Sequence, residues 1–216
     1  FFWVHLREVK IIIAFWKTDY TGVHARLVKD LLRSKMDANE YKDYLLSFVF
    51  YKYLSDTFLA KVYDGVEGGE PSSIEEAQRV YEEVARGEDA EEILSDLKED
   101  NLYVIDPSRT FYALAQNAAN NRFRREDLQS AFNDIQTSHP LFENLFADVD
   151  LYSNRLGTND TKQSATVAEL VTVINQADVL HAKGDVLGNA YEYLIGQLYK
   201  VWNDFQNPLT LLALRH

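Results

Sequence analysis

The residues best suited to chemistry in this chain are arginines. Arg122, Arg124 and Arg125 surround Phe123 in a segment that follows Asn120-Asn121. Guanidinium groups bind phosphate through two parallel hydrogen bonds, and arginines interleaved with an aromatic ring can stack on a base. This cluster is a candidate for contact with DNA or with a partner protein. Ordinary surface charge after the C-terminal end of a helix, where cations are favoured, explains it equally well.

A second basic stripe is weaker. Its members share the spacing of one helical face and are Arg26, Lys29 and Arg33. We include these three residues among the candidate contacts with DNA or a partner.

No residue pattern points to catalysis or to a metal. The chain has no cysteine, and its five histidines lack the spacing that places two metal ligands on one helix. Neither a nucleophile-elbow motif nor a phosphate-binding loop occurs. The paired glutamates fall at expected helix starts and exposed faces, where solvated charge is the simplest account. The sequence therefore predicts no catalytic residue, no cofactor-binding residue and no metal ligand.

Composition narrows the class of protein further. The 216 residues carry a net charge of −12, which argues against a self-sufficient nucleic-acid binder because DNA affinity comes largely from basic residues. Arg7, Glu8 and Lys10 interrupt the apolar first 16 residues, so we expect no membrane segment there. The absence of cysteine suits a reducing cytoplasm, where we expect the protein to lie.

Helical patterns dominate the chain. We expect a helix over 23–34 and a longer one opened by the capping box Asp37…Glu40 and stopped near Gly65. The boxes Ser73…Glu76 and Asp89…Glu92 predict helices over 74–86 and 90–99. Further helices are expected over 109–119, 125–137, 167–177 (opened by Thr166…Glu169) and 185–199.

These elements predict a mostly α fold, a multi-helix bundle. Residues 102–105 (LYVI) are the best candidate for a short strand, although an extended buried connector fits equally well. We divide the chain into an N-terminal arm (1–22), a helical domain (23–197) and an atypical tail (198–216). The residues expected in the core include Tyr41, Phe48, Tyr191 and Leu194.

Two segments carry a resemblance to a known family. Residues 32–46 read LRSKMDANEYKDYLL and are followed by FYKYLS at 50–55, which resembles the opening of type I modification subunits, LR-x-K-M-D-x-x-E-Y-K. Residues 148–157 and then 185–196 (DVLGNAYEYLIG) resemble the D-x-L-G-x-A-Y-E-Y-L helix that closes the N-terminal domain of those subunits. The chain thus resembles the N-terminal domain of the modification subunit of a bacterial type I restriction–modification system.

The resemblance implies a role that the residues alone do not. A complete subunit would methylate adenine at N6 with S-adenosylmethionine. Its partners would be a second modification subunit, a specificity subunit, restriction subunits and duplex DNA. The N-terminal domain would help to enclose the DNA and contact its neighbours. Asn207-Pro208-Leu209 lacks the second proline and the aromatic residue of the family's adenine-binding motif, so we expect this chain to stop short of the catalytic machinery, bind no cofactor and be inactive alone.

Two other classes of function stay open. An acidic protein that mimics DNA, or a protein-interaction module without catalysis, would suit the net charge. A free-standing enzyme is disfavoured because no nucleophile, base or metal constellation is visible. One continuous acidic face would support the mimic, whereas a basic strip containing residues 122–125 would support DNA enclosure.

Overall fold

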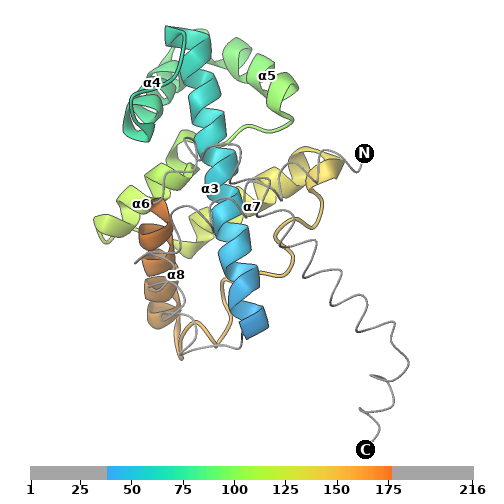
Figure 1. The fold of residues 1–216 in the computed structure, drawn as a ribbon, viewed down its shortest axis with the longest axis vertical. Coiled ribbons are helices and arrows are strands. Elements are labelled where there is room, and N and C mark those ends of the chain that lie inside the picture. The colour runs from blue at the N-terminus through green and yellow to red at the C-terminus, as the bar shows by residue number, and fades with distance from the viewer. Residues whose placement is uncertain (1–37, 177–216) are drawn as a thin grey trace, which may run out of the picture.

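The computed structural model describes residues 38–176, and within that range it is helical (Figure 1). The α-helices are α3 (Ala38–Glu67), α4 (Ile74–Arg86), α5 (Ala90–Asn101), α6 (Phe111–Ala119), α7 (Arg125–Ser138) and α8 (Asp160–Asn175). Two short 3-10 helices, η1 (Pro107–Arg109) and η2 (Pro140–Phe142), lie between them. The described part of the chain contains no strand, which confirms the mostly α fold.

Helix α3 is the axis around which the others pack. In Figure 1, α4 and α5 gather at its C-terminal end, and α8 lies beside its N-terminal half. Residues 48–52 of α3 are all buried, so most of the helix circumference is covered there, including the apolar face towards α7. Phe48 and Tyr51 on that face contact the Phe132 ring of α7, with ring centroids 6.0 and 5.4 Å apart. Phe48 is fully buried, as predicted.

The start signals located both α4 and α5, but only the side-chain cap of α4 forms. Ser73 accepts a hydrogen bond from the Glu76 amide at 3.2 Å, and α4 covers the predicted range. The Glu76 carboxylate reaches back one residue further than expected and accepts from the Ser72 amide at 2.9 Å. At α5, Asp89 has φ −92° and ψ 12° and makes no side-chain cap. Its backbone is not in the extended conformation that aims an N-cap side chain at the helix amides.

The predicted stop of α3 near Gly65 falls two residues short. The helix continues to Glu67 and ends where Gly68 and Gly69 adopt φ values of 77° and 91°. A glycine inside a helix only lowers its stability, whereas a left-handed backbone ends it. The left-handed backbone at Gly68 and Gly69 therefore sets the C-terminal end of α3.

Residues 102–105 form the extended buried connector rather than the strand. A side chain takes the place of a partner strand at one end of the segment, where the Tyr81 hydroxyl donates to the Ile105 carbonyl at 2.6 Å. The Tyr103 hydroxyl in turn donates to the Leu54 carbonyl of α3 at 3.0 Å. Helices surround the segment, so no second strand is present within the described range to pair with it.

The prediction for α8 is wrong at its start. The helix begins seven residues before 167, with Asn159 as the N-cap that accepts from the Lys162 amide at 2.9 Å. Thr166 lies inside α8 and is buried, and its hydroxyl donates to the Leu156 carbonyl at 2.7 Å. Thr166 therefore lies on the buried face of α8, and its capping-box pattern does not mark the start of the helix. The prediction consequently missed the first two turns.

The remaining boundaries differ little from expectation. Helix α6 starts at 111 instead of 109 because residues 107–109 form η1, and α7 matches within one residue. The expected helices 23–34 and 185–199, the divisions at 22 and 197, and the residues Tyr191 and Leu194 lie outside the described residues. So does the side chain of Tyr41. None of the helices in the described range is long and apolar enough to cross a membrane.

Candidate nucleic-acid or partner interface

The arginine cluster lies in the connection between α6 and α7, which we call the arginine loop (residues 120–124). The Arg122 amide donates to the Asn117 carbonyl at 2.7 Å, and Asn121 adopts φ 55°, which together end α6. Exposure then alternates: Arg122 and Arg124 are exposed, whereas Phe123 packs half-buried against the core. Side chains two residues apart in an extended chain lie on the same side. The loop therefore presents two arginines to solvent and one ring to the interior.

Arg125 does not belong with the exposed pair. Its side chain is only 4% exposed. The guanidinium donates to Gln163 Oε1 at 2.6 Å and to the Leu151 carbonyl at 3.3 Å, and it lies 4.5 Å from the centroid of the Tyr152 ring. A buried charge needs such partners, because desolvating it unpaired is very costly. The structure thus corrects the expectation for Arg125: its guanidinium is enclosed by protein and not presented to DNA.

The two exposed arginines keep their charge available. Arg124 approaches Glu126 at 3.9 Å, with both side chains more than half exposed, and such pairs contribute little. No described residue forms an ion pair with Arg122. The candidates Arg26, Lys29 and Arg33 lie outside the described residues. Contact of Arg122 and Arg124 with DNA or a partner stays a prediction.

Negative charge is concentrated elsewhere, in a region that we call the acidic lobe (residues 64–100). It contains 14 acidic and three basic residues, a net charge of −11, which leaves 20 acidic and 19 basic residues in the rest of the chain. The lobe consists of the end of α3, helices α4 and α5 and their connections. Among the described residues, those outside the lobe (38–63 and 101–176) have 12 acidic and nine basic side chains, so most of the negative charge lies in the lobe.

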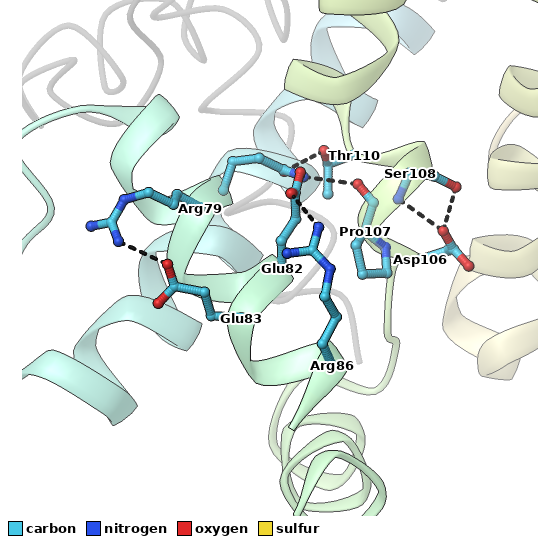
Figure 2. Close-up of polar contacts among 9 residues, drawn as sticks. Arg79, Glu82, Glu83, Arg86, Asp106, Pro107, Ser108 and Thr110 are labelled. Atoms are coloured by element: carbon cyan, nitrogen blue, oxygen red, sulfur yellow. Dashed lines mark hydrogen bonds and ion pairs between the residues drawn. The ribbon is translucent and has the colours of Figure 1, made fainter. Parts of the chain in front are cut away.

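The basic residues of α4 are paired with acidic neighbours, so each arginine cancels one carboxylate and is not available to bind an anion. Arg79 pairs with Glu83, and Arg86 pairs with Glu82, each at 2.9 Å (Figure 2). Both pairs join residues four apart on the exposed face of the helix. An approaching molecule would meet the lobe as a carboxylate surface.

Residues 27–174 match the family model of the HsdM N-terminal domain. The chain belongs to the HsdM N-terminal domain family.

Individual relatives agree with this assignment. The type I restriction enzyme MpnII methylase subunit of Mycoplasma pneumoniae is 28% identical over 192 residues, which cover 81% of this chain and 34% of that protein. The crystal structure of the type I restriction-modification methyltransferase subunit from Streptococcus thermophilus superimposes with a TM-score of 0.74 at 43% identity, covering 88% of this chain and 38% of that one. The chain thus spans little more than a third of the length of these relatives. The resemblance inferred from the two sequence segments is confirmed.

The HsdM N-terminal domain also contains a buried ion pair that the sequence did not lead us to expect. Lys52 and Asp56, one turn apart on α3, are joined at 2.6 Å, and each side chain is 3% exposed. The Lys52 ammonium lies 5.5 Å from the centroid of the Phe111 ring on α6. The available signal was the position of Lys52, which falls on the apolar face of α3 with an acidic residue four positions later.

A second polar cluster joins α4 to η1 and α6. The Gln78 amide donates to the Pro107 carbonyl at 2.9 Å and its oxygen accepts from the Thr110 hydroxyl at 2.6 Å, while Asp106 caps η1 through Ser108 (Figure 2). Thr110 also caps α6 by accepting from the Ala113 amide. This cluster positions helices, and no group of acidic or histidine residues in the described range could hold a metal ion.

Proposed function

We propose that this HsdM N-terminal domain is the assembly and DNA-enclosing part of a type I restriction–modification modification subunit. Family membership supports the class of protein. The observation that carries DNA enclosure is the separation of charge: the acidic lobe has a net charge of −11, whereas the other described residues (38–63 and 101–176) have a net charge of −3 and so oppose a duplex far less.

The partners and the chemistry belong to the whole subunit in this proposal. The subunit would act in the cytoplasm, in a complex with a second modification subunit, a specificity subunit and restriction subunits. It would methylate adenine at N6 with S-adenosylmethionine. Residues of this chain offer no adenine-binding Asn-Pro-Pro-Tyr or Asn-Pro-Pro-Phe segment, so methyl transfer would be performed by a domain other than the one described. Calorimetric titration of this chain with S-adenosylmethionine should accordingly release no heat beyond dilution.

Enclosure of DNA requires contacts that do not depend on base sequence. Contacts to phosphate fix the register and orientation of a protein on DNA, whereas contacts to base edges carry sequence information. The arginine loop offers the first kind of contact, and the specificity subunit would supply the second.

A crosslinking experiment tests which end of the domain meets DNA. A photoreactive residue is placed at Asn120 in the arginine loop or at Glu88 in the acidic lobe, both of which are exposed. Each full-length subunit is assembled with its specificity subunit on a labelled duplex and irradiated. We expect a DNA crosslink from position 120 and none from position 88. A crosslink only from position 88, or from neither position, would contradict the proposal.

The acidic lobe itself favours a second candidate function. A surface with net charge −11 over 37 residues is what a DNA mimic or an acidic protein-interaction module would present. Such a module would compete with duplex DNA for a basic protein surface. Crosslinks from position 88 to protein, combined with none from position 120 to DNA, would favour this candidate over enclosure.

A further inference from the structure

We infer that Arg122 and Arg124 act as one phosphate-contacting pair and that the buried Arg125 is the positioning residue that fixes this pair on the domain. The inference rests on the proposed contact with DNA and deepens it. It divides a run of arginines, which look equivalent in the sequence, into two that face a ligand and one that holds them in place.

Arg122 and Arg124 point to the same side of the arginine loop. Arg124 has extended backbone angles (φ −124°, ψ 128°), and the exposed and inward side chains alternate from 122 to 125. Residues two apart in such a segment are separated by roughly 6.5 Å along the chain. Arg122 and Arg124 therefore lie side by side, at a separation that suits two phosphates of one nucleic-acid strand better than one.

Phe123 and Arg125 hold the loop in place. Phe123 packs against the core on the inward side. Arg125 reaches the Leu151 carbonyl, Gln163 and Asp160, which belong to the segment before α8 and to its first turns. The Asp160 side chain is 91% exposed, so solvent weakens that pair. The Leu151 carbonyl, Gln163 and the Tyr152 ring thus determine the position of Arg125.

The exposed arginines suit a phosphate ligand. Arginine presents a planar fork of donors that matches phosphate oxygens, and it keeps its charge at all relevant pH values. Two such forks on one short, anchored loop lose little conformational freedom on binding. Nothing in this arrangement reads a base, so the pair should contribute affinity without sequence preference.

The test measures DNA affinity of the assembled complex as a function of salt. Replacing Arg122→Ala and Arg124→Ala together should weaken binding roughly tenfold at low salt. It should also reduce the slope of log K against log salt by about 0.9 for each phosphate that the protein no longer neutralises. The preferred DNA sequence and the melting temperature should not change. The matched control is Arg122→Lys with Arg124→Lys, which keeps the charge and should keep most of the salt slope.

Arg125 needs a different comparison, because its replacement also affects folding. Arg125→Met should reduce affinity and salt slope although its side chain is buried. Val62→Ala, a core change in α3 beside the acidic lobe, should lower the melting temperature and leave the slope unchanged. If Arg125→Met fails to fold, Tyr152→Ala replaces it: this ring is 43% exposed and stacks on the guanidinium, so its removal loosens Arg125 at small cost.

The outcomes separate this inference from the proposed function. If position 120 still crosslinks to DNA but the double alanine variant binds with unchanged affinity and salt slope, Arg122 and Arg124 do not contact phosphate. The proposed enclosure of DNA would still stand. If the double variant has a reduced slope and neither Arg125→Met nor Tyr152→Ala does, the positioning role of Arg125 is overturned. If position 120 gives no DNA crosslink in the unaltered complex, the proposed function itself fails.

Discussion

At the scale of single residues, burial decides what a charged side chain does in this domain. Lys52 and Asp56 are almost fully enclosed, whereas Arg79 and Glu83, which have the same four-residue spacing, are each 61% exposed. Taking two charges out of water is costly, and their mutual attraction offsets this cost only while both are present. The same sequence spacing therefore has very different energetic consequences.

We expect Asp56→Ala to destabilise the domain by about 3–5 kcal/mol, because it leaves the Lys52 ammonium buried without its carboxylate. Replacing both residues, Lys52→Met with Asp56→Leu, should cost far less than the single change. Urea unfolding at pH 7 measures both. Glu83→Ala is the control and should cost less than about 1 kcal/mol. Similar destabilisation by Asp56→Ala and Glu83→Ala would show that the Lys52–Asp56 pair is not enclosed as described.

At the scale of elements, tyrosine hydroxyls fasten the irregular segment between α5 and α6. Tyr51 donates to the Arg109 carbonyl at 2.6 Å, and Tyr81 donates to the Ile105 carbonyl at 2.6 Å. Both rings are fully buried. Burial, which disfavours the phenolate, raises the pKa of each hydroxyl above its ordinary value of 10.0. The connection between helices thus depends on two hydroxyl groups that must stay protonated.

Alkaline pH should therefore unfold the domain. Below pH 10 the tyrosines are protonated in both states, and their stabilising effect is fully present. Above pH 10 the unfolded chain loses these protons and the folded one keeps them. The free energy of unfolding should then fall by about 1.4 kcal/mol per pH unit for each tyrosine. Urea titrations between pH 8 and 11 measure this slope. Tyr81→Phe should reduce it by the contribution of one tyrosine, about 1.4 kcal/mol per pH unit. An unchanged slope in that variant would mean that Tyr81 ionises while folded.

The turn before α8 depends on a glycine for a steric reason. A Cβ on Gly157 would lie 2.6 Å from the Lys162 Cβ and 2.7 Å from the Gln163 amide nitrogen. The Gly157 carbonyl also accepts from the Gln163 side chain at 3.1 Å. The loop and the first turn of α8 therefore touch backbone to backbone.

Gly157→Ala should lower the free energy of unfolding by about 1–3 kcal/mol, since the loop must move away from α8. Gly65→Ala is the matched control. Gly65 lies within α3 with open space around it, and alanine there should stabilise the helix by about 0.5–1 kcal/mol. Thermal unfolding distinguishes the two, with opposite shifts in melting temperature expected. Equal shifts would show that the close approach to α8 is not the reason why position 157 requires a glycine.

At the scale of the whole molecule, charge is separated between the acidic lobe and the remainder of the domain. The lobe carries a net charge of −11, whereas the other described residues (38–63 and 101–176) carry −3. A field of this size acts over about 8 Å at physiological ionic strength, which limits its effect to nearby surfaces. The lobe should repel a duplex from its own end of the domain and leave the arginine loop accessible.

This chain alone should bind duplex DNA no more tightly than about 10⁻⁴ M at physiological salt, the weak limit of non-specific binding, because two arginines replace only a few counterions. Affinity in the assembled complex would come mainly from other subunits. Fluorescence anisotropy with a labelled duplex at roughly physiological salt measures the first quantity. Submicromolar binding by the chain alone would show that the described basic residues are not its main DNA contacts.

Local sequence patterns were sufficient to predict the features that act over a few neighbouring residues. Apolar residues at helical spacing predicted most of the helices, and Ser73 with Glu76 located the start of α4. These predictions succeeded because a cap or an amphipathic face acts within one or two turns of the chain. The segments 32–46 and 185–196 also carry the family pattern of the HsdM N-terminal domain.

Features that depend on neighbours distant in sequence could not be predicted without the folded structure. Arg125 looks like Arg122 and Arg124 in the sequence, yet Leu151, Tyr152 and Gln163 enclose it. Thr166 has the pattern of a helix start, yet it lies within α8 because Leu156 supplies a carbonyl for its hydroxyl. In both cases the free energy of a polar group depends on whether folding brings it a partner in place of water, and local sequence does not contain that partner.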